Sequence, residues 1–154
     1  MRAGGRIMIV GAAVAGLAGS VGFGAAAEQV AGPVRAEVMN VIDGDTIEAR
    51  AQLWIGLSLV SRIRIRGIDA PEMRGGCLEE KALAAAARDL LAELAGDAIL
   101  ISNIENDKYG GRVIADAAAA DGTDLGSEMV ARGLARPYDG GTRADWCPVA
   151  SIGG

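Results

Sequence analysis

The chain has 154 residues, a formal net charge of −5 and no histidine. This length suits one domain that buries a core of its own, and the scarcity of aromatic residues requires that core to be aliphatic. The absence of histidine excludes histidine general bases, histidine-ligated zinc and Ser-His catalytic pairs. Proton transfer near neutral pH therefore falls to carboxylates, lysine, tyrosine or cysteine.

The N-terminal segment has the order of a secretory signal. Arg2 and Arg6 precede an uncharged run that starts at Ile7, and small residues at Ala25 and Ala27 suit cleavage. The alternative is a retained membrane anchor, because the uncharged run is long enough to span a bilayer. Both interpretations place the folded part outside the cytoplasm, so we expect a periplasmic or secreted protein.

This interpretation divides the chain into three parts. Residues 1–27 form the signal peptide or membrane anchor, residues 28–33 a short linker, and residues 34–154 the folded domain. Loss of the first part removes two arginines and no acid, which changes the net charge from −5 to −7. An acidic domain does not coat nucleic acid generally, so any polyanion must meet a local basic patch. If the signal is cleaved, we expect no stable membrane association and a monomer.

Cys77 and Cys147 are the two cysteines of the chain. Their separation rules out a CxxC redox or zinc motif. In an oxidising compartment a disulfide between them is expected, and closing so long a loop stabilises by roughly 4 kcal/mol in the chain-entropy model. Two buried free thiols are the alternative.

Periodicity and turn residues predict five strands and two helices. Three strands with short connections form an antiparallel meander, followed by a helix rich in alanine and leucine, two more strands and a second helix. Leu83, Leu90, Leu91 and Leu94 fall near one face of the first helix, which we expect to pack on the sheet. The expected strands are residues 34–43, 46–54, 57–66, 98–104 and 112–120, and the expected helices are residues 79–95 and 124–133, the second with Asp124 as its N-cap.

This element order predicts an α+β fold that is mainly β, an OB-like five-stranded barrel with two or three helices. An open α+β sandwich produces much the same order of elements and stays open as an alternative.

The stretch "VIDGDTI" places Asp43 and Asp45 on a tight turn. As an ordinary Asp-Gly hairpin it presents two solvated carboxylates. Alternatively, the two carboxylates provide oxygen ligands for a hard cation such as Ca²⁺.

The stretch "RIRIRGIDAPE" alternates arginine with isoleucine along a strand. Ile63 and Ile65 should enter the core, while the arginines at positions 62, 64 and 66 share the other face. Such a row is tolerable where a phosphate or carboxylate cluster lies opposite. For Arg62 and Arg66 we favour an ordinary exposed strand that pairs with Glu48.

Beyond this strand, Gly67 lets the chain turn and Pro71 fixes the backbone between Asp69 and Glu72. In a chain without histidine, Glu72 is a credible general base. The alternative is that Glu72 and the acids after it cap the coming helix, as acidic residues do near helix starts. Arg64 and Asp69 differ by an odd number, so a regular strand would point them apart, and a shared site requires a break near Gly67.

The stretches "IDGDTI", "RIRGIDAPE" and "DKYGGR", in this order, resemble the staphylococcal-nuclease (thermonuclease) family, and "GSEMVARGLARPY" resembles its later helix. The resemblance covers about residues 34–138. It implies an OB-fold and Ca²⁺-dependent hydrolysis of phosphodiester bonds in DNA and RNA. Asp45, Asp69 and the Ala70 carbonyl would ligate Ca²⁺, while Asp43 would lie just outside the ligands and Thr46 would support the metal loop.

By the same resemblance, Glu72 is the general base and Arg64 and Arg112 bind phosphate. Tyr109 and Tyr138 match aromatic residues near the bound nucleotide. The family loop usually has one glycine before its arginine, whereas this chain has two, so Arg112 reaches the phosphate only if the loop absorbs the extra residue. The alternative function is a non-catalytic OB-fold module that binds oligonucleotides or another anion.

Overall fold

The computed structural model describes residues 28–108 and 110–147. The expected signal or anchor and Tyr109 therefore lie outside the described residues. No helix of the described part is long and apolar enough to cross a membrane. In chain order, the described elements are β1 (Gln29–Val30), β2 (Val34–Asp43), β3 (Thr46–Trp54), β4 (Leu57–Ile65), β5 (Ile68–Asp69), α1 (Leu78–Ala95), β6 (Ala98–Asn106), β7 (Arg112–Ala119), α2 (Leu125–Ala131) and β8 (Arg136–Pro137).

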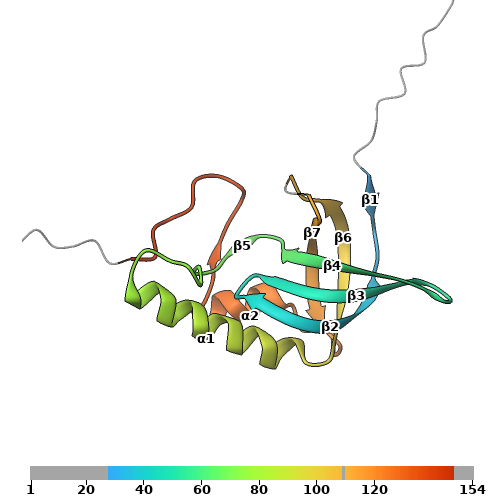
Figure 1. The fold of residues 1–154 in the computed structure, drawn as a ribbon, viewed down its shortest axis with the longest axis horizontal. Helices are drawn as coiled ribbons and strands as arrows, with labels where there is room; N and C mark the ends of the chain where they lie inside the picture. Colours follow the sequence, from blue (N-terminus) through green and yellow to red (C-terminus); the bar gives the residue numbers. More distant parts are fainter. Residues whose placement is uncertain (1–27, 109, 148–154) are drawn as a thin grey trace, which may run out of the picture.

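Five of the strands close into a barrel (Figure 1). The antiparallel pairing of β2 with β3 and of β3 with β4 confirms the predicted meander. The parallel pairing of β4 with β7 and the antiparallel pairings of β7 with β6 and of β6 with β2 complete the circle. This closure confirms the predicted OB-fold barrel and excludes the open sandwich. β1, which falls in the expected linker, pairs with β6 and extends the sheet.

The core is aliphatic, as the composition predicts. Ile63 and Ile65 are buried inside the barrel, which confirms the inward face of the alternating strand. Leu125 and Met129 of α2 are fully buried in the same core. α2 also has the predicted N-cap, since the Asp124 carboxylate accepts a hydrogen bond from the backbone N–H of Ser127.

The face of helix α1 that packs on the barrel differs from the predicted leucine face. The four leucines expected on its packing face are not equivalent, because Leu91 is fully buried whereas Leu83 is 36% exposed. The buried residues follow the helical spacing of three and four and are mostly small: Glu80, Ala84, Ala87, Leu91 and Ala95. The prediction was therefore wrong for Leu83, because alanines rather than leucines form most of the contact.

Small side chains let α1 approach the turn between β2 and β3 very closely. A Cβ atom added at Gly44 would lie 2.6 Å from the Ala87 Cβ and 2.8 Å from the Ala70 Cβ. A side chain at position 44 therefore cannot fit without moving the helix or the turn. This contact fixes the turn that carries Asp43 and Asp45 against the helix and the segment after β5.

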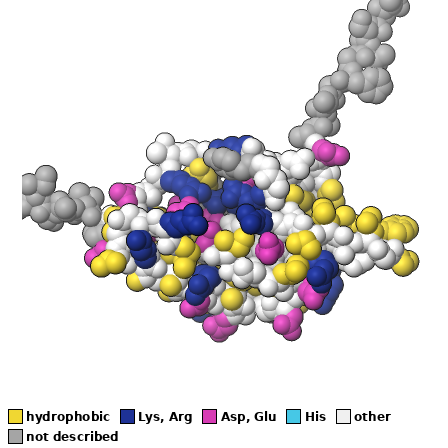
Figure 2. All heavy atoms as spheres, in the orientation of Figure 1, with side chains coloured by type: hydrophobic (Ala, Val, Ile, Leu, Met, Phe, Trp, Pro, Cys, Tyr) yellow, Lys and Arg dark blue, Asp and Glu magenta, His cyan; other side chains and the backbone are white. Residues whose placement is uncertain are grey.

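β3 and β4 continue beyond the barrel as a hairpin that projects to the right in Figure 1. Its tip turns at Gly56 and leaves Trp54 and Ile55 73% and 92% exposed. The apolar side chains at the right of Figure 2 belong to this region. The hairpin tip lies away from the polar cluster described next.

Candidate active site

A bend after β4 brings Asp69 back to Arg64. Gly67 has φ 80°, a left-handed conformation that glycine adopts at little cost, and the chain then enters β5. The Arg64 guanidinium donates a hydrogen bond to the Ile68 carbonyl at 3.2 Å and lies 3.8 Å from Asp69 Oδ1. The expected break near Gly67 is present, and it resolves the odd spacing of the two side chains.

Asp45 lies on the other side of the same guanidinium. Its Oδ2 atom accepts hydrogen bonds from Arg64 at 2.8 Å and from the Ala70 backbone N–H at 3.3 Å. Its Oδ1 atom accepts a hydrogen bond from the Thr46 hydroxyl at 2.8 Å. Arg64, Asp45 and Asp69 are all buried, so this triad is desolvated and depends on mutual pairing.

Asp43 lies beside this triad at the end of β2. Its Oδ1 atom accepts a hydrogen bond from the Asp45 backbone N–H at 3.2 Å. Burial, together with the negative charge of Asp45, raises the pKa of the Asp43 carboxyl to about 6. This end of the barrel is therefore crowded with negative charge, the surroundings in which a cation would relieve repulsion.

Asp69 has one satisfied oxygen and one unsatisfied oxygen. Oδ2 accepts a hydrogen bond from the Trp146 indole N–H at 3.2 Å. Oδ1 is buried and has no hydrogen-bond donor among the described residues, although the Arg143 Nε atom lies 3.0 Å away in an ion pair. Such a buried acceptor is costly unless another partner meets it.

The residues at this end of the barrel fit a calcium ion. The donors are carboxylate oxygens, the type that Ca²⁺ prefers, and Asp69 Oδ1 is a buried oxygen that lacks a hydrogen bond. Elsewhere in the described residues, Cys77, Glu80 and Cys147 have side-chain atoms close enough together to hold a metal ion. The two sulfurs are joined in a disulfide, so they cannot act as thiolate ligands.

Glu72 lies beyond the buried triad and is about half exposed. Its backbone N–H donates to Glu80 Oε1 at 3.3 Å, while the Gly76 N–H donates to Glu80 Oε2 at 2.8 Å. Buried Glu80 in the first turn of α1 therefore holds the loop that carries Glu72. Glu72 does not cap the helix, because the N-cap residue is Cys77.

Arg112 begins β7, directly after the loop with the additional glycine. Gly111 adopts φ 77°, and the Arg112 Nε atom donates to Asp107 Oδ2 at 2.8 Å across the loop. The register of β4 and β7 sets Arg112 beside Arg62 and Ile114 beside Arg64. The loop thus accommodates the second glycine, and Arg112 lies on the same face of the sheet as Arg64.

A groove of about 760 Å³ contains both arginines. Arg64, Lys108, Arg112 and Arg143 line it together with Tyr138. Figure 2 shows basic side chains gathered in the upper middle of the molecule, with acidic side chains between them. A local basic patch is therefore present on an otherwise acidic chain, as binding of a polyanion requires.

The other two arginines of the alternating strand form surface ion pairs. Arg62 lies 3.9 Å from Glu48, as expected for an exposed strand. Arg66 instead pairs with Glu105 at 3.4 Å and Asp116 at 3.2 Å. The expected partner of Arg66 was therefore wrong, because the closed barrel brings β6 and β7 next to the end of β4.

Sequence reasoning did not find Arg143. Its guanidinium is hydrogen-bonded to the Glu72 carboxylate and paired with Asp69, so it joins two segments about 70 residues apart in sequence. The expected disulfide could have predicted this contact. Cys77 lies five residues after Glu72, and Cys147 lies four residues after Arg143. Pairing the cysteines therefore brings the residues before Cys147 near Glu72.

The fold and the groove together define an OB-fold protein with an acidic centre and a basic rim. A family model described as staphylococcal nuclease homologue matches residues 62–145, more than half of the chain. The chain belongs to this family. The matched part contains Arg64, Asp69, Glu72 and Arg112 and begins after the turn that carries Asp45. No curated protein matched the chain.

Proposed function

We propose that the protein is an exported Ca²⁺-dependent nuclease that hydrolyses phosphodiester bonds in DNA or RNA. One observation carries this proposal: the buried triad of Arg64, Asp45 and Asp69 adjoins a groove that Arg64 shares with Arg112. Membership of the nuclease family supports the same reaction class. Paired acids alone are common in proteins, but buried acids beside a groove that is lined by arginines suit a phosphodiester.

Asp45, Asp69 and the Ala70 carbonyl would hold the calcium ion, with Asp43 and Thr46 supporting the turn. When bound, the ion supplies Lewis-acid stabilisation of the charge that develops on the phosphoryl oxygens. The protein's own contribution begins with desolvation, since Asp45 and Asp69 are buried and already oriented by hydrogen bonds.

Glu72 acts as the general base. Its carboxylate accepts a proton from the attacking water as the new bond to phosphorus forms and the bond to the leaving oxygen breaks. Arg64 and Arg112 donate hydrogen bonds to the phosphoryl oxygens, where planar guanidinium groups suit the geometry. Tyr138, which lines the groove, and Tyr109 provide aromatic surface for the nucleotide.

The test is release of acid-soluble nucleotides from single-stranded DNA by purified protein with its disulfide intact. We expect activity with Ca²⁺, loss of activity with chelator, and a decrease of about 10²- to 10⁴-fold for Glu72→Gln, the usual contribution of a general base. Glu79→Gln is the matched control, since Glu79 is an exposed acid in the first turn of α1. Activity unchanged by chelator, or by Glu72→Gln, would refute this mechanism.

The rival function is a non-catalytic OB-fold module, which would bind oligonucleotides in the same groove without turnover. The feature that distinguishes the two is whether Arg64, Glu72 and Arg112 converge on one cation site. Arg64 and Arg112 line one groove, and Arg143 joins Glu72 to Asp69 beside it, which supports the nuclease. The rival predicts oligonucleotide binding and no nucleotide release in the assay above.

Export forms part of the proposal because disulfides persist in oxidising compartments. The protein would act in the periplasm or medium as a monomer with nucleic acid as its substrate. Expression of the full chain should yield a processed protein in those fractions that starts near Glu28 by intact mass. Recovery in the cytoplasm with both thiols free would contradict this placement.

A further inference from the structure

The last described residues cross the proposed active site. This C-terminal segment, residues 138–147, begins where the Tyr138 backbone N–H donates to the Gly67 carbonyl at 2.8 Å. It ends at the disulfide between Cys147 and Cys77, whose Cα atoms are 5.9 Å apart. The segment is therefore attached at both ends, once to the bend before β5 and once to the start of α1 (Figure 1).

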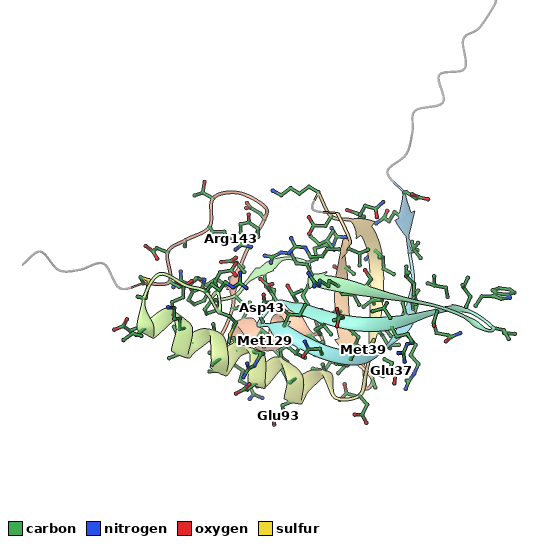
Figure 3. All side chains as sticks on the ribbon, viewed as in Figure 1. Glu37, Met39, Asp43, Glu93, Met129 and Arg143 are labelled. Carbon is green, nitrogen blue, oxygen red and sulfur yellow. A yellow bond between two sulfur atoms is a disulfide. The ribbon has the colours of Figure 1, made fainter. Side chains whose placement is uncertain are left out.

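Within this segment, Arg143 contacts two of the proposed functional acids. Its Nε atom lies 3.0 Å from Asp69 Oδ1, and its guanidinium is hydrogen-bonded to Glu72. Partial burial acts to lower the pKa of Arg143, but the hydrogen bond to Glu72 and the charges of Asp69, Glu72 and Asp45 outweigh it and raise that pKa. Figure 3 shows Arg143 at the same end of the molecule as Asp43. Arg143 therefore stays charged at the mouth of the acidic centre.

Arg143 also faces the groove. Its side chain is 42% exposed, and it lines the groove together with Arg64 and Arg112. A half-exposed ion pair contributes little to stability, so folding alone gives a weak reason for this arginine. A half-exposed guanidinium that lines one groove with two other arginines is well placed to meet an anion.

The negative charge at this end of the barrel would repel an approaching phosphate, so a positively charged side chain near the entry favours binding. The carboxylates of Asp43, Asp45, Asp69 and Glu72 gather here. Arg64 pairs with Asp45 and Asp69, and Arg143 pairs with Asp69 and Glu72. Lys108 and Arg112 also line the groove, but Arg143 is the half-exposed cation in direct contact with Asp69 and Glu72, whereas Arg64 is buried.

We propose that Arg143 is a third phosphate-binding residue of the nucleic-acid site and that the Cys77–Cys147 disulfide holds it there. This inference rests on the proposed nuclease function. When a substrate phosphate arrives, the Arg143 guanidinium exchanges its hydrogen bond with Glu72 for hydrogen bonds to phosphate oxygens. Glu72 then becomes available to accept a proton. No covalent bond changes in this exchange.

The direct test measures binding rather than turnover. A fluorescently labelled single-stranded oligodeoxynucleotide is titrated with protein in EDTA at several salt concentrations, with anisotropy as the signal. For Arg143→Ala we expect Kd to rise about tenfold, the effect of one lost charge-assisted contact. The slope of log affinity against log salt should become shallower by about 0.7, the contribution of one phosphate on a single strand.

Two variants make the measurement specific. Arg143→Lys keeps the charge and should keep the salt slope, with a smaller rise in Kd because the planar guanidinium is lost. Arg50→Ala removes an exposed arginine that pairs with Glu37 at 2.8 Å and lies outside the groove, so its Kd and slope should match the wild type. Thermal unfolding of each variant verifies that it is folded.

The disulfide is tested with Cys77→Ser combined with Cys147→Ser. Serine is a good N-cap, so α1 keeps its cap at position 77 while the attachment is lost. We expect this pair to weaken binding about as much as Arg143→Ala, and adding Arg143→Ala to it should change little further. If the double serine variant binds the oligodeoxynucleotide with the Kd and the salt slope of the wild type, the disulfide does not hold Arg143 in the site and that part of the proposal is wrong.

The outcomes separate this inference from the function it rests on. If the wild type binds and hydrolyses DNA but Arg143→Ala leaves Kd and salt slope unchanged, Arg143 is only an ion-pair partner of Asp69 and Glu72. If Arg143→Ala binds more tightly or cleaves faster, Arg143 blocks the site and the inference is wrong. If the wild type neither binds nor cleaves, the proposed nuclease function fails together with the inference.

Discussion

Arg64 keeps its charge in a buried position because two carboxylates lie against it. Asp45 Oδ2 is 2.8 Å from one terminal nitrogen and Asp69 Oδ1 is 3.8 Å from the other. Removing any one of the three leaves a buried charge without full compensation, which is costly. At the scale of single residues, the candidate site is thus a set of mutually dependent charges, and its acid-base behaviour follows from their spacing.

Asp43 provides a prediction of pH dependence for the calcium-free protein. Its folded pKa of about 6 lies above the ordinary 3.8, so the folded state holds this proton more tightly than the unfolded state. This lowers the stability of the folded state by an amount that disappears well below the unfolded pKa of 3.8, grows between about pH 4 and pH 6, and is fully present above about pH 6. Asp43→Asn should therefore raise the free energy of unfolding by about 1 kcal/mol at pH 7.5, after allowance for partial exposure.

Urea unfolding in EDTA at pH 7.5 and at pH 4 measures this effect. The gain from Asp43→Asn should be several-fold smaller at pH 4, because the wild-type carboxyl is then protonated in the folded state and already partly protonated in the unfolded state. Asp89→Asn on the exposed face of α1 is the control and should show no such gain. An equal gain in the free energy of unfolding at both pH values would show that the charge of the Asp43 carboxylate does not destabilise the wild type.

Helix α1 positions the site through close backbone approach. Ala87 lies against Gly44 of the turn that bears Asp45, and Glu80 holds the loop that bears Glu72. Both contacts come from the buried stripe of the helix. The helix therefore supports two of the three stretches that make the site, although it contributes no proposed catalytic residue.

Leu91 and Leu83 provide a matched pair for testing this packing. Leu91→Ala should lower the free energy of unfolding by about 2 to 5 kcal/mol, because it leaves a cavity in the core. Leu83→Ala, at a site that is 36% exposed, should cost less than about 1 kcal/mol. Denaturant unfolding of both variants measures the difference, and equal losses would contradict the observed orientation of the helix.

Across the whole molecule, the disulfide joins positions 70 residues apart. In the chain-entropy model a loop of this length stabilises by about 4 kcal/mol, through restriction of the unfolded chain. Cys77→Ser combined with Cys147→Ser should lower the free energy of unfolding by about 4 kcal/mol, as measured by urea denaturation. Reducing agent should shift the wild type in the same direction and leave the double variant unchanged. A double variant as stable as the oxidised wild type would contradict the prediction.

Local sequence predicted most of the elements, whereas the roles of the proposed site residues came from the resemblance of the ordered motifs to a family. Strand alternation, the glycine turns and the Asp124 cap depend on near neighbours, so they were predicted with bounds close to those observed. The bend at Gly67 could also be inferred, because the odd spacing of Arg64 and Asp69 required it. These features follow from backbone sterics and side-chain periodicity, which operate within a few residues.

Only the tertiary structure decided which distant groups meet. The partners of Arg66, the buried stripe of α1 and the pairing of Arg143 with Glu72 depend on closure of the barrel and on the disulfide. The Arg143 contact joins residues 71 apart, and no periodic pattern encodes such a distance. The sequence by itself thus determined the turns and strands and, through a family resemblance, the candidate acids and arginines. Long-range packing decided which arginines share one groove and which acids lie beside it, because those contacts join residues that no local pattern relates.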